Sequence, residues 1–337
     1  MISIIICSTK SILNEALRNN IIKTIGVPHE IIHIDNSQGK YNIFEAYNLG
    51  VKQAKGEYLC FMHEDIIFHS QNWGKAVELH LSQPFVGALG VAGGNVVLDK
   101  LDWRFYGFGQ VYLIQGNSST EETPGYYISH TVSKDPHIPL SQVAVLDGVW
   151  ICIRKDLFNQ IRFDDHNFHD FHLYDSDICM QVNQMGLGVF VTYDVLLEHK
   201  SEGTFSEGYK DSLAVFANKW KDCLPLIKGM VVSNEQINEA LTKAQIMFDK
   251  RLAHDAIIIR LRKFFNAKRN GEQCPELTDE EIQVLDESAF SYRKICIKNK
   301  ELTNSDVWPL ICQYMKSPYA KRKAKLLTKY VWYRVIR

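Results

Sequence analysis

The start of the chain constrains its fold more than any other segment. Residues 2–7 (ISIIIC) form a short run dominated by isoleucine. A run this short and this rich in β-branched side chains favours a strand over a helix, and its lack of alternation is typical of a strand buried on both faces. The chain is therefore predicted to begin with the first strand of a parallel sheet.

A helix and two further strands follow this run. Residues 31–34 predict a second strand, which ends in the polar turn formers of residues 35–39. Residues 43–54 carry apolar side chains at helical spacing, and residues 57–62 (EYLCFM) predict a third strand that leads into the polar residues 63–65. Ligands of such units bind outside the carboxyl ends of the strands, so we expect both polar loops at one edge of the sheet.

The middle of the chain continues the alternation of strands and helices. Residues 143–153 predict a strand interrupted at Asp147 and Gly148, residues 175–185 a helix, and residues 189–192 another strand. A carboxylate inside an apolar run costs several kcal/mol unless it is paired or lines a cavity. Asp147 and Gly148 are therefore predicted to line a cavity, although a bulge with a satisfied carboxylate would give the same pattern.

Length and composition indicate two parts and no overall attraction to nucleic acid. A chain of 337 residues exceeds the size at which a single core usually stops growing. We predict an α/β domain over residues 1–225, with a mostly parallel central sheet and helices on both faces, and a helical region over residues 226–337. With 38 Lys and Arg against 39 Asp and Glu, the formal charge of -1 provides no field that recruits nucleic acid.

The cysteines and the apolar segments predict a cytoplasmic protein. The eight cysteines are scattered without Cys-x-x-Cys pairs, so we expect them to be reduced core residues. The N-terminal residues lack the basic region and cleavage site of a signal peptide, and no apolar stretch of about 18 residues occurs. We expect neither secretion through a signal peptide nor a membrane span.

Residues 316–337 carry the one strong charge asymmetry. They contain eight Lys and Arg, no acidic residue and several interleaved aromatic and leucine side chains. This pattern is typical of a segment that lies on an anionic membrane surface, which would place the protein at the inner face of a membrane. A nucleic-acid contact and a solvated helix are the alternatives.

Three segments resemble the family 2 glycosyltransferases: ISIIICSTK, IIHIDNS and AYNLGVKQAKGEYLCFMHED. The resemblance covers about residues 1–205 and implies the GT-A fold, a nucleotide-diphosphosugar donor and a bound Mn²⁺ or Mg²⁺. His63 stands where this family has the first Asp of its DxD motif, and Asp65 occupies the last position. Charged residues that simply solvate a loop after a strand are the alternative explanation of residues 63–65.

The resemblance assigns roles to residues that follow the predicted strands. Asp65 would be the first metal ligand and His199 the second, each at the end of a strand. Donor contacts are implied for residues after the first three strands: Ser8, Asp35, Asn36, His63 and Glu64. A plain turn is the alternative for residues 35–37.

A second acidic cluster, Asp175 and Asp177, begins a predicted helix and resembles the ED-x-D segment of the same family, with Tyr174 in place of the Glu. Inverting transfer needs a base that takes the proton of the attacking hydroxyl, and Asp175 matches it. With this resemblance, Asp147, Gly148 and Asp177 are predicted to contact the transferred sugar or the acceptor. Capping of the helix by either carboxylate is the competing explanation.

Together these features predict a metal-dependent glycosyltransferase that inverts configuration. It would move a sugar to a hydroxyl of a saccharide or a lipid-linked acceptor, in the synthesis of surface polysaccharide. An inert scaffold of the same shape is the first alternative, because His63 replaces an Asp. A sugar nucleotidyltransferase is the second, although residues 8–11 (STKS) are a poor substitute for its glycine-rich phosphate loop.

Overall fold

The computed structural model describes residues 1–115, 126–128, 139–200, 205, 208–269, 278, 279, 308, 311, 312, 315, 316 and 327. The chain divides into two compact units. The first comprises residues 1–203 and 208–245, and the second comprises residues 204–207 and 246–337. The domain boundary expected at residue 225 stays a prediction.

The first unit is built on a sheet of seven strands: β1 (Ile2–Ser8), β2 (His29–Asp35), β3 (Tyr58–Met62), β5 (Val86–Gly90), β11 (Leu140–Val143), β13 (Trp150–Arg154) and β14 (Gly188–Thr192). Their order is β11-β14-β5-β13-β3-β1-β2. Only β13 and β11 run against their neighbours, since β1 pairs in parallel with β2 and β3, and β14 with β5. The predicted α/β fold with a mostly parallel sheet is confirmed.

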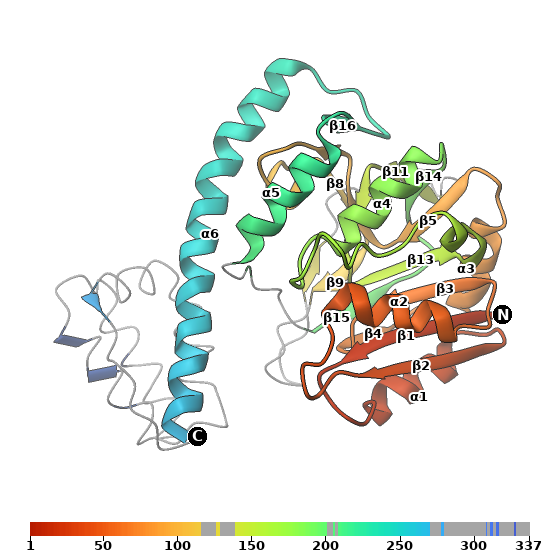
Figure 1. Cartoon of the computed structure of the whole chain (residues 1–337), viewed down its shortest axis with the longest axis horizontal. Coiled ribbons are helices and arrows are strands. Elements are labelled where there is room, and N and C mark those ends of the chain that lie inside the picture. Colours follow the sequence, from red (N-terminus) through yellow and green to blue (C-terminus); the bar gives the residue numbers. More distant parts are fainter. Residues whose placement is uncertain are drawn as a thin grey trace. The chain divides into compact units, whose positions relative to one another are not determined.

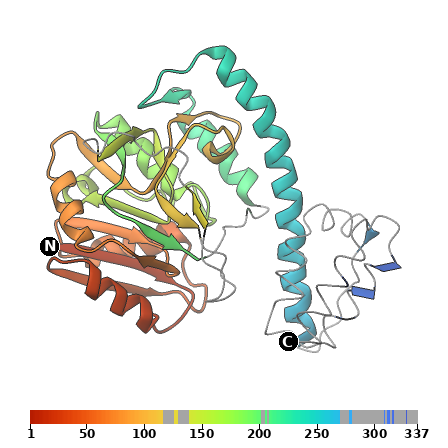
Figure 2. The same cartoon turned by 180° about the vertical axis from the view of Figure 1, so that it is seen from behind.

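The described residues form six α-helices and two short 3₁₀ helices: α1 (Glu15–Thr24), α2 (Ile43–Gln53), α3 (Trp73–Leu81), α4 (Tyr174–Gln184), α5 (Gly208–Trp220), α6 (Asn234–Arg269), η1 (Trp103–Phe105) and η2 (Lys155–Asn159). Successive side chains of β1 point to opposite faces of the sheet. Ile4 belongs to the cluster that α1 and α3 complete with Leu17 and Val77, whereas Ile5 contacts Gly50 of α2 on the other face. Figures 1 and 2 show α2 and α1 on these opposite sides.

The described part of the chain also contains three smaller sheets. One contains β4 (Ile66–Phe68), β9 (Leu113–Gln115), β10 (Tyr126–Ile128) and β15 (Leu197–His199). The others contain β6 (Ala92–Gly94), β8 (Gly109–Val111) and β12 (Val145–Leu146), and the pair β7 (Val96–Val97) and β16 (Leu226–Ile227). The antiparallel pairing of β15 with β4 sets His199 opposite Ile66, one residue after Asp65.

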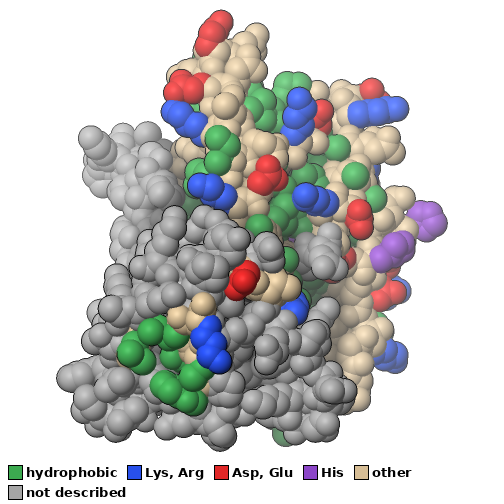
Figure 3. All heavy atoms as spheres, turned by 90° about the vertical axis from the view of Figure 1, so that its left-hand side faces the viewer, with side chains coloured by type: hydrophobic (Ala, Val, Ile, Leu, Met, Phe, Trp, Pro, Cys, Tyr) green, Lys and Arg blue, Asp and Glu red, His purple; other side chains and the backbone are tan. Residues whose placement is uncertain are grey.

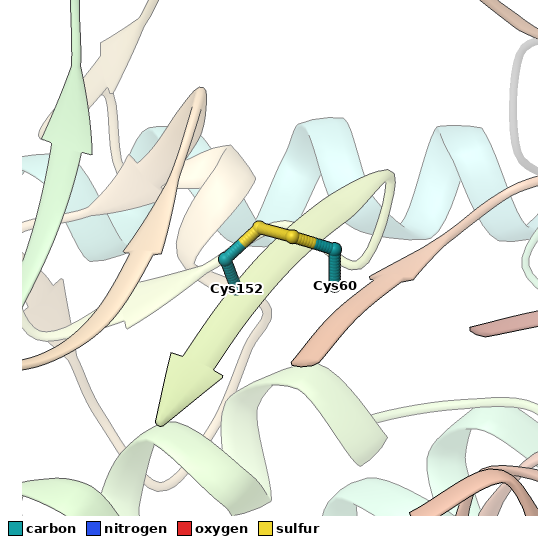
Figure 4. The surroundings of a disulfide bond; sticks show 2 residues. All are labelled: Cys60 and Cys152. Carbon is teal, nitrogen blue, oxygen red and sulfur yellow. A yellow bond between two sulfur atoms is a disulfide. The ribbon is translucent and has the colours of Figure 1, made fainter. Parts of the chain in front are cut away.

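Two cysteines depart from the expectation that all eight are reduced. Cys60 of β3 and Cys152 of β13 are joined by a disulfide (Figure 4). They occupy opposed positions of neighbouring antiparallel strands, which brings their Cα atoms to 4.2 Å. A sequence separation of 92 positions hides this pairing from the sequence. Among the other described cysteines, Cys7, Cys179, Cys223 and Cys312 are free.

One face of the described surface shows mixed charge. On the face drawn in Figure 3, Lys and Arg side chains are interspersed with Asp and Glu. None of the described helices combines the length and the apolar character that crossing a membrane would require. Apart from Lys316 and Leu327, the basic segment 316–337 lies outside the described residues.

Candidate active site

The two predicted metal ligands, Asp65 and His199, converge with His63, a predicted donor contact, at the end of β3. His63 follows β3, Asp65 precedes β4, and His199 ends β15, the strand paired with β4. One nitrogen or oxygen atom from each lies within 4.8 Å of the other two. His199 Nε2 is 3.3 Å from His63 Nδ1 and 3.4 Å from Asp65 Oδ1. The ends of β3 and β15 therefore bring two imidazoles and one carboxylate together around a common point.

This donor set fits a divalent transition metal. Imidazole nitrogens bind metals only in the neutral form, and burial together with the neighbouring His199 lowers the pKa of His63 to about 4. The ring is therefore neutral at physiological pH. Two nitrogens and one oxygen suit Mn²⁺ and the later first-row metals, whereas Mg²⁺ prefers oxygen ligands throughout.

A buried tyrosine contacts the outer side of this cluster. The hydroxyl of Tyr174, the first residue of α4, lies 3.0 Å from His63 Nε2 and donates to the Gly148 carbonyl at 3.1 Å. The buried side chain packs against other aromatic rings, including Tyr47 of α2 and Phe163. Its position is therefore fixed by packing as well as by hydrogen bonds.

Asp175, the predicted base, lies on the other side of the Gly148 peptide. Its Oδ2 accepts hydrogen bonds from the Gly148 N–H at 2.9 Å and from Arg104 Nη2 at 3.3 Å. Burial raises the pKa of Asp175 to about 6, even though the Arg104 guanidinium opposes this rise. A carboxylate with a pKa close to neutrality is suited to accept a proton and to release it again.

Arg104 of η1 organises the acidic side chains of the site. Its guanidinium donates to Asp147 Oδ2 at 2.8 and 3.0 Å and to Asp102 Oδ2 at 2.8 Å, besides Asp175. Burial alone would raise the pKa of Asp147, but Arg104, the Val149 N–H and the two histidines lower it to about 2. The Asp147 carboxylate is therefore ionised, and it is close enough to Arg104, His63 and His199 for their charges to act on it.

Asp102 fixes Arg104 from behind. Its side chain is fully buried and accepts from the Tyr209 hydroxyl of α5 at 2.7 Å and from the Arg104 backbone N–H at 2.9 Å. The carboxylates around Arg104 keep the pKa of the guanidinium well above its usual value, despite the opposing effect of burial. The arginine remains charged whenever Asp175 titrates.

The loops after β1 and β3 are tied together by Glu64. Its carboxylate accepts from the Ser8 hydroxyl, and from the Thr9 N–H and hydroxyl at 3.2 and 2.9 Å. A cavity of about 460 Å³ opens beside this link. Its lining includes Glu64, Asp65, Lys10 and Lys200, so it offers both carboxylate and ammonium groups to a ligand.

The turn after β2 lies beside the same loops. Ser8 and Asp35 are paired in the parallel register of β1 and β2, and the Asn36 N–H donates to the Ser8 carbonyl at 2.9 Å. The side chain of Asn36 is hydrogen-bonded to the backbone of Tyr41, and Asp35 accepts from the Ser37 N–H at 2.9 Å. The exposed Asp35 carboxylate thus combines a turn-forming contact with a position at the predicted donor edge.

Asp177 lies apart from the other predicted site residues. Its buried carboxylate is 2.7 Å from Lys219 Nζ, and it accepts from Trp220 Nε1 at 2.9 Å and Gln181 Nε2 at 2.8 Å. These contacts link α4 to α5. Its contact with the acceptor stays a prediction.

Two site residues have no function assigned from the sequence. Arg104 lies in an aromatic segment of weak periodicity, and only its position as a lone cation among apolar residues could have drawn attention to it. In the sequence, Tyr174 stands out only as a departure from the ED-x-D pattern. Its partner His63 is 111 positions away, so no local spacing connects the two residues.

A model of the glycosyltransferase-like family matches residues 3–219, about two thirds of the chain and the whole of the site described above. The chain belongs to this glycosyltransferase family. Its resemblance to the family 2 enzymes is confirmed, and the protein is a transferase with an α/β fold.

Individual relatives are distant. The chain is 25% identical over 265 residues to the glycosyltransferase GlyG of Streptococcus pneumoniae, covering 72% of this chain and 79% of that protein. Among solved structures, the mannosyltransferase PcManGT of Pyrobaculum calidifontis, in complex with GDP-Man and Mn²⁺, is 13% identical with a TM-score of 0.42, over 98% of this chain and 87% of that one. TarS 1–349 of S. aureus, in complex with UDP-GlcNAc, is 12% identical with a TM-score of 0.39, over 100% and 93%.

Proposed function

We propose that this glycosyltransferase uses a nucleotide-diphosphate sugar and a divalent metal ion to glycosylate a hydroxyl group with inversion. The observation that carries the proposal is the convergence of His63, Asp65 and His199 within 4.8 Å, with Asp175 across the Gly148 peptide. A metal-binding cluster and a base with a raised pKa are the two groups that such a transfer requires.

The ion would be held by His63, Asp65 and His199. We propose that this ion is Mn²⁺ and that Mg²⁺ binds more weakly. The bound cation would neutralise the negative charge that develops on the departing diphosphate. Asp65 supplies the negative charge of the cluster, and the two imidazoles supply neutral nitrogens. Lys10 and Lys200, which line the adjoining cavity, would attract the phosphates of the donor.

Asp175 would act on the acceptor. The ionised carboxylate takes the proton of the acceptor hydroxyl while the hydroxyl oxygen forms a bond to the anomeric carbon. The bond between that carbon and the diphosphate oxygen breaks on the opposite face, and the nucleoside diphosphate leaves with the bonding electron pair. Attack from the face opposite the leaving group inverts the configuration.

The remaining predicted residues would position the two substrates. Ser8, Asp35 and Asn36, at the ends of β1 and β2, would contact the nucleoside of the donor. Glu64 would keep these loops together through Ser8 and Thr9. Because Asp147 is close to the cluster and the Gly148 N–H donates to the base, we propose that they face the transferred sugar or the acceptor, a saccharide or a lipid-linked molecule.

A donor panel with two variants tests this function. UDP-, GDP- and dTDP-sugars are added with Mn²⁺, and both thermal stabilisation and nucleoside diphosphate release are measured; a bound donor raises the unfolding temperature by mass action. We expect Asp175→Asn to keep the stabilisation and lose the transfer, and Asp65→Ala to lose both. Asp156→Asn, the same change at an exposed side chain, is the matched control. Normal turnover by Asp175→Asn would disprove its role.

We also propose that the enzyme works at the cytoplasmic face of a membrane in surface polysaccharide synthesis, with residues 316–337 on anionic lipid. Binding to vesicles with and without phosphatidylserine, with and without these residues, tests the contact. Disulfides are rare in cytosolic proteins. A disulfide between Cys60 and Cys152 that survives rapid alkylation in intact cells would count against this location.

A further inference from the structure

His63 and Tyr174 are the two positions at which the site departs from the family pattern, and the structure brings them together. Tyr174 begins α4, and His63 follows β3. The Tyr174 hydroxyl is 3.0 Å from His63 Nε2. An imidazole in place of an Asp therefore contacts a phenol in place of a Glu, which indicates that the two replacements work as a unit.

The hydrogen bonds of Tyr174 determine which nitrogen of His63 carries a proton. A hydroxyl has one proton, and a carbonyl oxygen can only accept, so the proton of Tyr174 points to the Gly148 carbonyl at 3.1 Å. The Tyr174 oxygen then accepts, and His63 Nε2 must donate to it.

A neutral imidazole that is protonated at Nε2 has its lone pair at Nδ1. This is the nitrogen that faces the cluster, because Nδ1 is the atom 3.3 Å from His199 Nε2. A metal ligand must present a lone pair, and the hydrogen bond of its other ring nitrogen fixes both the tautomer and the orientation of the ring.

We infer that Tyr174 is a positioning residue that holds His63 in the tautomer whose Nδ1 lone pair faces Asp65 and His199. The pair thereby replaces a carboxylate ligand by an oriented neutral nitrogen. Gly148 supports it, because a side chain at this position would overlap the Tyr174 hydroxyl. The inference rests on the proposed function, since it concerns the metal site of that function.

Titration of the protein with Mn²⁺ in the absence of donor tests whether Tyr174 affects metal binding. We expect Tyr174→Phe, which removes only the hydroxyl, to weaken Mn²⁺ binding by about 10- to 100-fold in titration calorimetry, as loss of such a partner typically does. The matched control is Tyr193→Phe, whose hydroxyl is hydrogen-bonded to Gln110 and Ser141. It should bind Mn²⁺ as the wild type does.

A spectroscopic measurement separates positioning from a general effect on folding. Long-range ¹H–¹⁵N spectra of histidine-labelled, metal-free protein report the tautomer of each ring, and His63→Gln assigns the signal. We expect His63 protonated at Nε2 in the wild type and in Tyr193→Phe, and a mixture of tautomers in Tyr174→Phe.

The outcomes distinguish this inference from the proposed function. If the wild type binds no Mn²⁺, both fail. If it binds Mn²⁺ and Tyr174→Phe binds equally well, or if wild-type His63 is protonated at Nδ1, only the role of Tyr174 is overturned. An equal loss of binding in Tyr174→Phe and Tyr193→Phe would also overturn it.

Discussion

Replacing Asp175 by Asn should change how the stability of the protein depends on pH. Burial raises the pKa of this carboxyl from 3.8 to about 6, so the folded state holds the proton more tightly than the unfolded state does. Stability from this group is therefore fully present below pH 3.8 and is lost as the pH rises through about 6. Asn cannot titrate, and Arg104 keeps Asp102 and Asp147 as partners.

The size of the effect follows from the shift. A rise of about two pKa units corresponds to roughly 3 kcal/mol, of which about 2 kcal/mol is lost between pH 4.5 and pH 7.5. The unfolding free energy of Asp175→Asn relative to the wild type should therefore rise by about 2 kcal/mol over this interval, whatever its starting value. The sign is specific: the variant gains on the wild type as the pH increases.

Urea unfolding at several pH values measures this difference without any substrate. The tryptophan signal is suitable, because Trp73 and Trp150 are fully buried in the unit that contains the site. Asp156→Asn reports the effect of the same substitution at an exposed position. A relative stability of Asp175→Asn that stays constant within about 0.5 kcal/mol, or that falls with pH, would refute a buried Asp175 with a raised pKa.

Three further predictions concern activity and packing. The rate of transfer by the wild type, measured as nucleoside diphosphate release, should rise with pH through about 6 as Asp175 ionises. In Arg104→Gln this rise should occur about 1–3 pH units higher than in Arg104→Lys, which keeps the positive charge. Identical pH profiles of the two variants would exclude Arg104 as a charge partner of Asp175. Gly148→Ala should lower the free energy of unfolding by about 1–3 kcal/mol, because the added methyl overlaps the Tyr174 hydroxyl, and unchanged thermal and urea unfolding would contradict that packing. Chelation by EDTA should stop transfer and added Mn²⁺ should restore it, more effectively than Mg²⁺ at equal concentration; full activity in EDTA would contradict a metal-dependent reaction.

Several elements were predictable because their signals are local. The runs at residues 2–7 and 57–62 became β1 and β3, and the helical spacing after residue 42 became α2, which Asn42 begins with a capping box. The helices α1 and α3 were not predicted. The buried residues of α1 are only Leu17, Ile21 and Thr24. Because so short a stripe lies among polar neighbours, the sequence shows no clear helical pattern of apolar residues there.

Part of the candidate site could also be predicted from the sequence, for the same reason. The carboxyl ends of parallel strands meet at one edge, so the polar residues after β1, β2 and β3 could be placed together from chain order. Asp177 shows the limit of this reasoning. Its spacing from Asp175 matches a family motif, yet its side chain turns toward Lys219, a residue that only the packing of α5 brings near.

The sequence by itself determined the alternation of strands and helices, the family and the acidic and imidazole residues at the strand ends, because each depends on neighbours along the chain. Only the tertiary structure decided that Arg104 joins Asp102, Asp147 and Asp175, that Cys60 bonds to Cys152, and that Tyr174 orients His63. Nearly all of these contacts join segments tens of residues apart. Hydrogen bonding and side-chain orientation at such separations depend on strand register and helix packing, which no local pattern encodes.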